Sequence, residues 1–278
     1  MDSDGVKKKA RRHGGTKARG TGAPALDRFD LYEIAVTSPG PLARFLKAAH
    51  GGRPRTLGED FSGAAALSRA WIELDPRHRA IAVDKDPAVV AALASKVARL
   101  SEACAQNLLP INSDVLRAKH PCDILACTNF PICYWHTRPA LLKYLNHARS
   151  RLSPRGIFVA DLYGGSDAFH TGKQTVHFRL KGQRIEYTWE QRKADPISGR
   201  VHNAIHFRIG GRAIRNAFEY DWRLWSIPEL SEAMIEAGFQ EVEIYDRLGD
   251  AIDQDGNVLI QPAEDLDDPH VVYVVART

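Results

Sequence analysis

The stretch Arg55–Trp71 joins a short run ending in acid, a tight glycine turn and a segment of helical character. The run ends at the acidic pair Glu59-Asp60, and the alanine-rich helical segment follows the turn at Gly63. Small side chains in this turn let a ligand approach the backbone where the helix begins. The free N–H groups of a first helical turn favour electronegative ligand groups. The stretch therefore predicts a strand–turn–helix unit that carries a ligand site.

A second strand end also carries acidic side chains. Residues Ala80–Asp86 read as a buried strand that ends in acid. Asp84 lies 21 residues after Gly63, about where a βαβ nucleotide-binding unit places the carboxylate that takes ribose hydroxyl groups. The two strand ends together indicate a site for a nucleotide-like ligand.

Apolar runs and helical segments alternate along the first part of the chain, which is typical of α/β folds. The connections are too short for hairpins to dominate, so we expect a parallel sheet. One or two helices are expected in Asp27–His50. The predicted strands are Arg55–Glu59, Ala80–Asp84, Leu108–Ser113, Asp123–Thr128 and Gly156–Asp161, and the predicted helices are Gly63–Leu74, Pro87–Leu100 and Thr137–Leu152.

Residues 164–225 break this alternation. Their apolar side chains recur with period two, between glycine-containing turns, which is typical of antiparallel strands. We expect them to form a β-rich cap inserted after the fifth strand. The expected cap strands are Val176–Leu180, Ile185–Trp189, Ile205–Ile209 and Ala217–Leu224, followed by a helix from Ser226 to Ala237 and by strands Val242–Tyr245 and Val271–Ala276.

The glycine turn resembles the first motif, E/D-x-G-x-G-x-G, of the class I, Rossmann-like S-adenosylmethionine-dependent methyltransferases. Glu59 takes the acidic position and Gly63 the central glycine, while Phe61 and Ala65 replace the outer two glycines. The resemblance covers Asp27–Thr278 and is to bacterial stand-alone members of unassigned substrate. It implies an α/β fold with a seven-stranded, mostly parallel sheet whose seventh strand runs antiparallel between strands five and six. It also implies an enzyme with S-adenosylmethionine as cofactor.

The resemblance assigns roles to the polar strand ends. It places Glu59 near the amino acid part of the cofactor, Asp84 at the ribose hydroxyls and Asp114 at the adenine amine. The loop Asn129-Phe130-Pro131 is expected to line the cofactor, although it is also a poor match to the N-P-P-F/Y motif of amino-methylating nucleic-acid enzymes. The expected cofactor residues are Glu59, Asp60, Phe61, Ser62, Gly63, Ala64, Asp84, Lys85, Asp114, Val115, Asn129 and Phe130.

Catalysis of methyl transfer, an in-line displacement at a sulfonium, depends mostly on orientation and on the exclusion of water. An amine acceptor needs only to be neutral, whereas a hydroxyl acceptor needs a base. His136 is the candidate base, with Asp161 and Tyr163 behind it. A structural role for this histidine, next to two aromatic side chains, stays open.

The cap and the loop before it are rich in aromatic side chains. They are expected to form a substrate chamber suited to a cationic or amino-acid-like ligand. The alternative is that these rings attach the cap to the sheet. The candidate substrate residues are Tyr134, Trp135, Tyr220, Trp222 and Arg223.

Charge is distributed unevenly along the 278 residues. Residues 1–25 hold seven Lys or Arg against two Asp, a net charge of +5, so that the net +4 of the whole chain leaves −1 for the remainder. The segment has almost no large apolar side chains and is predicted to be a disordered tail. A basic tail can bind nucleic acid or stay solvated. The near-neutral remainder, one domain spanning residues 26–278, favours a small-molecule acceptor over nucleic acid.

The composition restricts the redox state, the metal binding and the cellular location that we expect. The four cysteines form no C-x-x-C pair, so we expect reduced thiols and no metal site. The absence of a long apolar run or a secretory signal predicts a cytoplasmic protein without a membrane span. No oligomeric state is indicated. The prediction is a methyltransferase acting on N or O of a small molecule. The alternatives are an RNA or protein methyltransferase guided by the tail, and a non-catalytic nucleotide-binding module.

Overall fold

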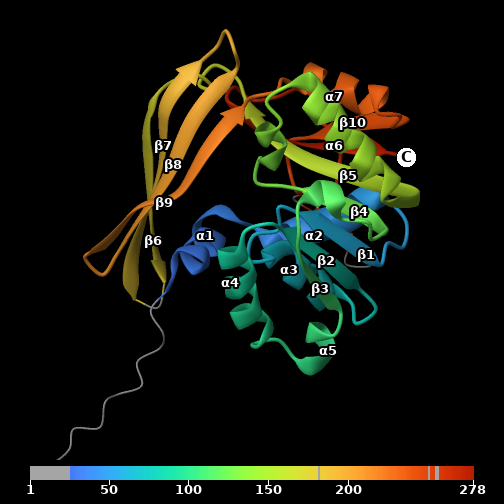
Figure 1. The fold of residues 1–278 in the computed structure, drawn as a ribbon, viewed down its shortest axis with the longest axis horizontal. Coiled ribbons are helices and arrows are strands. Elements are labelled where there is room, and N and C mark those ends of the chain that lie inside the picture. The colour runs from blue at the N-terminus through green and yellow to red at the C-terminus, as the bar shows by residue number, and fades with distance from the viewer. Residues whose placement is uncertain (1–25, 181, 250, 254–256) are drawn as a thin grey trace, which may run out of the picture.

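A seven-stranded sheet forms the centre of the molecule (Figure 1). The computed structural model describes residues 26–278 except residues 181, 250 and 254–256, so the predicted tail, residues 1–25, lies outside the described residues. The strand order is β10-β13-β5-β4-β1-β2-β3. The strands are β1 (Thr56–Asp60), β2 (Arg79–Asp84), β3 (Leu108–Asn112), β4 (Cys122–Cys127), β5 (Leu152–Gly164), β10 (Glu241–Tyr245) and β13 (His270–Arg277).

Strand directions follow the prediction. Strands β1 to β5 pair in parallel, whereas β13 pairs antiparallel with both β5 and β10. The last strand therefore lies antiparallel between the fifth and the sixth strands of the sheet. The fold class predicted from the sequence is confirmed.

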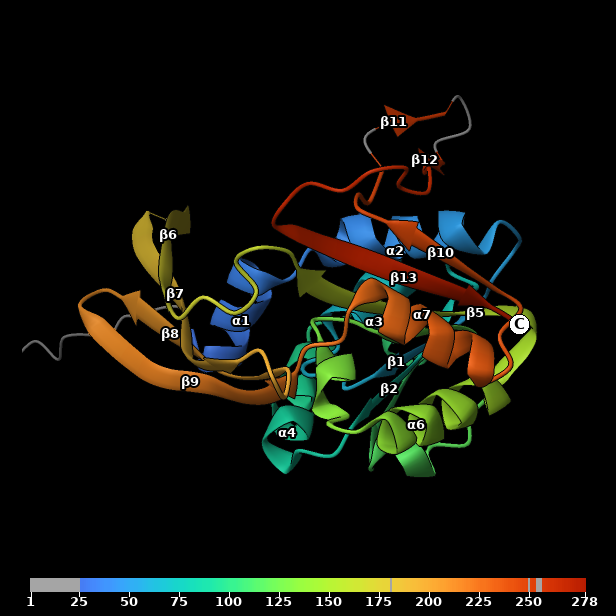
Figure 2. The same cartoon turned by 90° about the horizontal axis from the view of Figure 1, so that it is seen from above.

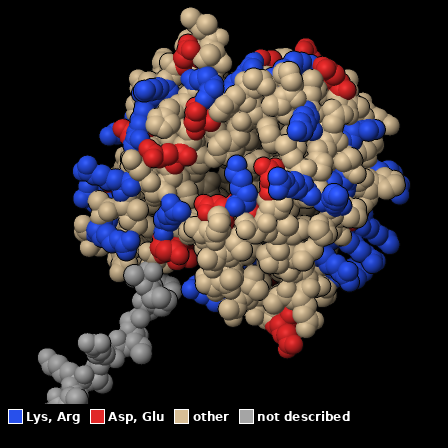
Figure 3. Space-filling view, in the orientation of Figure 1, with Lys and Arg blue, Asp and Glu red and all other residues tan. Residues whose placement is uncertain are grey.

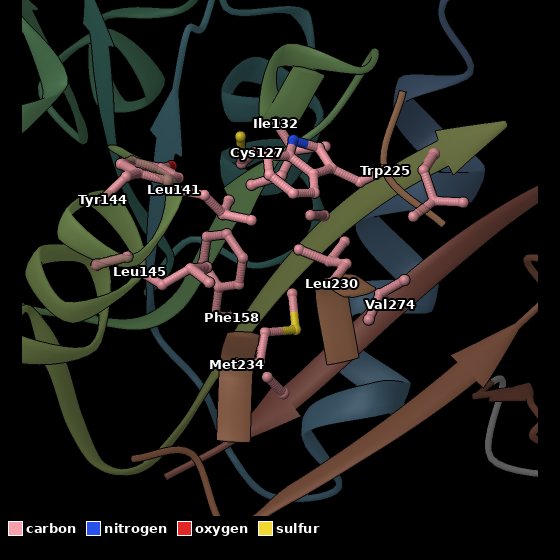
Figure 4. Close-up of a cluster of buried hydrophobic side chains, with 14 of the residues drawn as sticks. Cys127, Ile132, Leu141, Tyr144, Leu145, Phe158, Trp225, Leu230, Met234 and Val274 are labelled. Atoms are coloured by element: carbon pink, nitrogen blue, oxygen red, sulfur yellow. The ribbon is translucent and has the colours of Figure 1, made fainter. Parts of the chain in front are cut away.

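Helices cover both faces of the sheet because its strands are apolar on both sides. One face is covered by α2 (Pro39–His50), α3 (Ala66–Leu74) and α4 (Pro87–Val97). Phe45 of α2 and Trp71 of α3 are fully buried against it. The other face is covered by α6 (Arg138–Ser150) and α7 (Ile227–Glu236). Figure 4 shows Leu141 of α6, Phe158 of β5 and Met234 of α7 gathered in this second core.

The cap is a separate four-stranded antiparallel sheet, in the order β6-β7-β8-β9. Its strands, β6 (Gly172–Leu180), β7 (Gln183–Asp195), β8 (Arg200–Ile209) and β9 (Arg212–Arg223), fall within residues 164–225. Helix α1 (Arg28–Val36) lies between the cap and the rest of the molecule in both ribbon views (Figures 1 and 2). Leu31 of α1 is fully buried against Ile185 and Phe207 of the cap.

Several short elements were not predicted. They are α5 (Glu102–Ala105), the 3-10 turns η1 (Val115–Arg117) and η2 (Pro131–Tyr134), and the two-residue strands β11 (Ala251–Ile252) and β12 (Val258–Leu259). Helix α3 begins at Ala66 rather than at Gly63, because residues 63–65 form a turn.

Within the described part of the chain, no helix is long and apolar enough to cross a membrane.

Candidate active site

The carboxyl ends of β1 to β5 open into a cavity of about 820 Å3. This volume lies within the range of roughly 300–1,000 Å3 that is typical of small-molecule sites, and ligands of open α/β sheets bind at this end of the strands. Helix α1 and cap strand β9 supply the facing walls. The predicted residues that line the cavity are Glu59, Phe61, Ser62, Gly63, Ala64, Asp84, Lys85, Asp114, Val115, Asn129, Tyr134, Trp135, Asp161, Tyr220 and Trp222.

The turn after β1 has an unusual backbone. Phe61, Gly63 and Ala65 have φ values of 56°, 53° and 54°, all in the left-handed region. A side chain makes this region unfavourable by about 1–2 kcal/mol per residue, so the surrounding contacts must hold Phe61 and Ala65 in place. A Cβ added to Gly63 would meet no other atom within 4 Å. The backbone of this turn is therefore open to a ligand in the cavity.

Glu59 connects the end of β1 to α3. Its carboxylate accepts hydrogen bonds from the backbone N–H and the hydroxyl of Ser68, at 2.9 and 2.5 Å. Burial raises the pKa of Glu59 to about 7, although both bonds from Ser68 act in the opposite direction. Glu59 lies in the wall of the cavity, and its predicted role near the amino acid part of the cofactor stays a prediction.

Asp84 and Asp114 lie at the next two strand ends. The carboxylate of Asp84 accepts the N–H of Gly63 at 3.0 Å and the N–H of Asp86 at 2.9 Å. Asp114 accepts the N–H of Leu116 at 2.9 Å and so begins η1. Burial raises the pKa of Asp84 above its usual range. Backbone donors therefore fix the orientation of both carboxylates.

Asp60 was predicted to bind the cofactor, but the structure places it elsewhere. Its carboxylate is fully buried on the other side of β1 and pairs with Arg151 at 2.9 Å. The hydroxyl of Tyr144 donates to it at 3.0 Å. Successive side chains of a strand point to opposite faces, so Glu59 and Asp60 cannot both reach the cavity.

Asp161 anchors the loop after β4. One carboxylate oxygen accepts the N–H of Asn129 and the other accepts the N–H of Phe130, both at 2.7 Å. Burial raises the pKa of Asp161 to about 7. Phe130 does not line the cavity, because its ring packs edge-on against Tyr163 and Trp222 behind the wall. Tyr163 itself lies behind the wall as well.

His136 and Arg223 lie outside the cavity, contrary to prediction. His136 donates from Nε2 to the carbonyl oxygen of Asp221 at 2.8 Å. Arg223 donates to the carbonyl oxygen of His136 and to Glu229, and its guanidinium lies 3.8 Å from the ring centre of Trp225. These contacts attach β9 to the loop before α6 and to α7. The predicted base and the predicted charged substrate contact are structural in this arrangement.

An aromatic wall faces the strand ends. Tyr220 and Trp222 of β9 stack with ring centres 4.4 Å apart, and the ring of Tyr134 lies 6.1 Å from that of Trp222. Phe61 stacks on Tyr134 at 5.9 Å. These rings form a continuous wall from the turn after β1 to cap strand β9.

Helix α1 supplies further residues of the cavity wall. Phe29, Tyr32 and Glu33 line the cavity, and Tyr32 packs on Phe218 of β9 at 4.9 Å. The resemblance to the methyltransferases implied that this leading segment closes over the cofactor, whereas Phe29 and Glu33 were not predicted from the sequence. Within the described ranges, no group of three or more His, Cys, Asp or Glu side chains is arranged to hold a metal ion.

Comparisons with known proteins identify the fold. No family model and no curated protein sequence matches this chain. Solved structures do match, among them an S-adenosylmethionine-dependent methyltransferase from Clostridium acetobutylicum, with a TM-score of 0.65 at 15% identity over 89% of this chain and 96% of that one. The fold is that of the class I methyltransferases.

Two further structures with the class I methyltransferase fold cover nearly the whole chain. The sugar N-methyltransferase KedS8 from Streptoalloteichus has a TM-score of 0.62 at 17% identity, over 97% of this chain and 100% of that one. The S-adenosylmethionine-bound amino pentose methyltransferase CalS10 from Micromonospora echinaspora has a TM-score of 0.62 at 14% identity, over 89% of this chain and 97% of that one.

The backbone of the turn after β1 can be set beside the first motif that the sequence resembles. The three left-handed residues, Phe61, Gly63 and Ala65, fall at the three glycine positions of E/D-x-G-x-G-x-G. Two of these positions hold a residue with a side chain in a conformation that favours glycine. Glycine adopts this conformation without strain, whereas Phe61 is held there by its contacts with Tyr134, Trp135 and Tyr144.

Proposed function

We propose that this protein is an S-adenosylmethionine-dependent methyltransferase that acts on a small molecule with an amine acceptor. The observation that best supports this proposal is that carboxylates at three strand ends line one cavity, together with the open backbone at Gly63. They are those of Glu59, Asp84 and Asp114. Three acidic groups in a row suit the amino group, the ribose hydroxyls and the adenine amine of the cofactor. The fold is compatible with this assignment.

The shape of the cavity supports a small-molecule acceptor. Helix α1 and strand β9 enclose the side opposite the strand ends, and their aromatic side chains Tyr32, Phe218 and Tyr220 line it. Closed aromatic walls suit a ligand that is bound by burial and by stacking. On the face drawn in Figure 3, Lys and Arg are interspersed with Asp and Glu, which differs from the basic stripe that a nucleic-acid acceptor favours.

Two features of the cavity favour nitrogen over oxygen as the acceptor atom. A hydroxyl acceptor needs a base, yet no histidine lies among the described residues that line the cavity, and each oxygen of Asp161 already accepts a backbone N–H group. The lining residues also include seven carboxyl groups against two cations, Arg28 and Lys85. Acidic groups and aromatic faces attract a protonatable amine. The sugar N-methyltransferase and the amino pentose methyltransferase among the similar structures are consistent with this choice.

The reaction assigns binding and orientation to the chain's own residues. When bound, S-adenosylmethionine supplies an electrophilic methyl group on its sulfonium sulfur. Glu59, Asp84 and Asp114 orient the ligand along the strand ends, and the rings of Tyr134 and Trp222 exclude water from the centre of the cavity. These residues would hold the acceptor nitrogen in line with that methyl group, so that the nitrogen lone pair would form the new bond as the carbon–sulfur bond breaks and the proton of the amine would leave to solvent.

Replacement of Asp84 tests the cofactor assignment. Asp84→Ala should weaken binding of S-adenosylmethionine by about 1–3 kcal/mol, because polar partners of the carboxylate are left unsatisfied. Isothermal titration calorimetry measures the effect, with Asp84→Asn as the milder variant that keeps one acceptor oxygen. Undiminished affinity in Asp84→Ala would contradict the assignment.

A panel of amines and matched alcohols tests the acceptor, with cofactor that carries a labelled methyl group. Labelling of alcohols alone would contradict the choice of nitrogen as the acceptor atom.

A further inference from the structure

The clamp between Asp161 and the loop after β4 uses the whole carboxylate. Its two oxygens each accept one backbone N–H, from Asn129 and Phe130, at 2.7 Å. The side chain of Asp161 belongs to β5, the strand next to β4, and only 5% of the residue is exposed. Charge-assisted bonds to backbone donors are stronger than neutral ones. Both oxygens of this one side chain therefore tie the backbone of the loop to the neighbouring strand.

The loop needs such a clamp because its backbone is strained. Asn129 and Phe130 have φ values of 71° and 68°, two successive residues in the left-handed region. Asparagine tolerates this conformation better than most side chains, whereas phenylalanine does not. Residues in such conformations persist only where the surroundings hold them. Both strained residues are the ones whose N–H groups Asp161 binds.

The clamped loop carries part of the cavity wall. Thr128, Asn129 and Pro131 line the cavity, as does Tyr134 at the end of η2. The ring of Phe130 packs against Trp222 with centres 5.9 Å apart. A change in the backbone at 129–130 would therefore move the wall on both the loop side and the cap side.

We propose that Asp161 is a positioning residue, which holds the 128–131 backbone in its strained form so that the acceptor amine is aligned with the transferred methyl group. The proposal rests on the function proposed above. Asp161 acts through the loop rather than by accepting a proton from the acceptor. An amide cannot replace the carboxylate, because it has one acceptor oxygen and its NH2 group would face a second N–H donor.

Kinetics of Asp161→Asn provide the first test, with amine acceptor and S-adenosylmethionine as substrates. We expect kcat to fall roughly 10-fold, while the Kd of S-adenosylhomocysteine stays unchanged. The matched control is Asp123→Asn. Asp123 also accepts two successive backbone N–H groups, those of Arg55 and Thr56 at 2.8 and 2.9 Å, but with a single oxygen and at the opposite end of the sheet. Because one amide oxygen can keep both of these bonds, this control should spare kcat. An unchanged kcat in Asp161→Asn, or an equal fall in both variants, would overturn the proposal.

A double-mutant cycle with Asn129→Gly separates positioning from proton transfer. Glycine adopts positive φ without strain, so a loop with Gly at 129 depends less on the clamp. The loss of kcat caused by Asp161→Asn should shrink from roughly 10-fold to about 2-fold in the Asn129→Gly background. A general base would be needed equally in both backgrounds. The same loss in both would therefore assign proton transfer to Asp161 and overturn positioning.

Amide hydrogen exchange tests the clamp without reference to activity. The N–H groups of Asn129 and Phe130 should be protected in the wild-type protein and should exchange at least about 10-fold faster in Asp161→Asn. If the wild type transfers no methyl group to any amine but shows this difference, the proposed function fails and the clamp stands. Unchanged exchange in the variant would overturn the clamp itself.

Discussion

Two carboxyl groups of the cavity are almost completely removed from water, those of Glu59 and Asp161. They are 6% and 5% exposed, and burial raises the pKa of each to about 7. A cationic ligand favours the ionised forms. The protonation of Glu59 is therefore coupled both to stability and to ligand binding, whereas the two backbone N–H donors to Asp161 favour its ionised form.

Stability should fall as the pH rises through the window set by Glu59. The pKa of its carboxyl is 4.5 in the unfolded chain and about 7 in the folded protein, so between these values the folded protein holds a proton that the unfolded chain has released. The free energy of unfolding then decreases with rising pH, by up to about 3 kcal/mol for this group. Glu59→Gln, which is neutral throughout, should remove this part of the dependence. Urea denaturation from about pH 5 to about pH 8 measures the difference, and identical slopes for both proteins would contradict it.

Residue type and strand parity explain which site residues were predictable. Glu59, Asp84 and Asp114 follow apolar runs directly, and strand ends of a parallel sheet meet at one edge. Arg223 follows Trp222 in one strand, and successive side chains point to opposite faces. The aromatic residue faces the cavity while the arginine faces α7. The alternating pattern of this strand predicts that it has two faces, but it does not indicate which face lines the cavity.

Helix α1 joins three parts of the molecule. Its charged side is held by Lys96 of α4, which pairs with Asp30 at 2.7 Å and with Glu33 at 3.0 Å, and by Arg69 of α3, which pairs with Glu33 at 2.6 Å. Its apolar side packs on the cap through Leu31. Because α1 also lines the cavity, its attachment should control access to the site. Local capping by Asp27 favours the helical form of α1. Its ion pairs and its packing on the cap, in contrast, involve residues far away in the chain.

Removal of Lys96 should loosen α1. Lys96→Met keeps the aliphatic length but leaves Asp30 and Glu33, two half-buried carboxylates, without this cation. We expect a loss of about 1–3 kcal/mol in stability, faster amide exchange in α1 and weaker cofactor binding by calorimetry. Arg77→Met is the matched control, because Arg77 pairs with Asp75 at 2.7 Å on the surface, away from the cavity. Equal behaviour of the two variants would contradict a role for α1 in the site.

The layers of the molecule were predictable because they follow from burial, whereas the antiparallel seventh strand was implied by the resemblance to the class I methyltransferases. Apolar runs of the sheet strands are covered on both faces, and the period-two pattern of the cap is covered on one, so each pattern indicates its layer. The orientation of the cap was not predictable. It depends on Leu31, Ile185 and Phe207 meeting in one cluster, although they lie far apart in the sequence. The aromatic side chains of the cap therefore have two uses. Trp222 lines the cavity, while Phe207 packs on α1 and attaches the cap.

The last prediction concerns residues 1–25, which carry a net +5 while residues 26–278 carry −1. The cavity is lined only by residues from Arg28 onward among those described, so deletion of residues 1–25 should leave cofactor affinity, melting temperature and turnover of a small amine unchanged. Salt dependence supplies the complementary measurement, because binding to a polyanion weakens steeply as salt rises, whereas binding of a small amine in an enclosed site is screened much less. Activity of the full-length protein should therefore change little between about 50 and 200 mM salt. Loss of activity on truncation, together with a steep fall with salt in the full-length protein, would instead support an RNA acceptor that is guided by the basic segment.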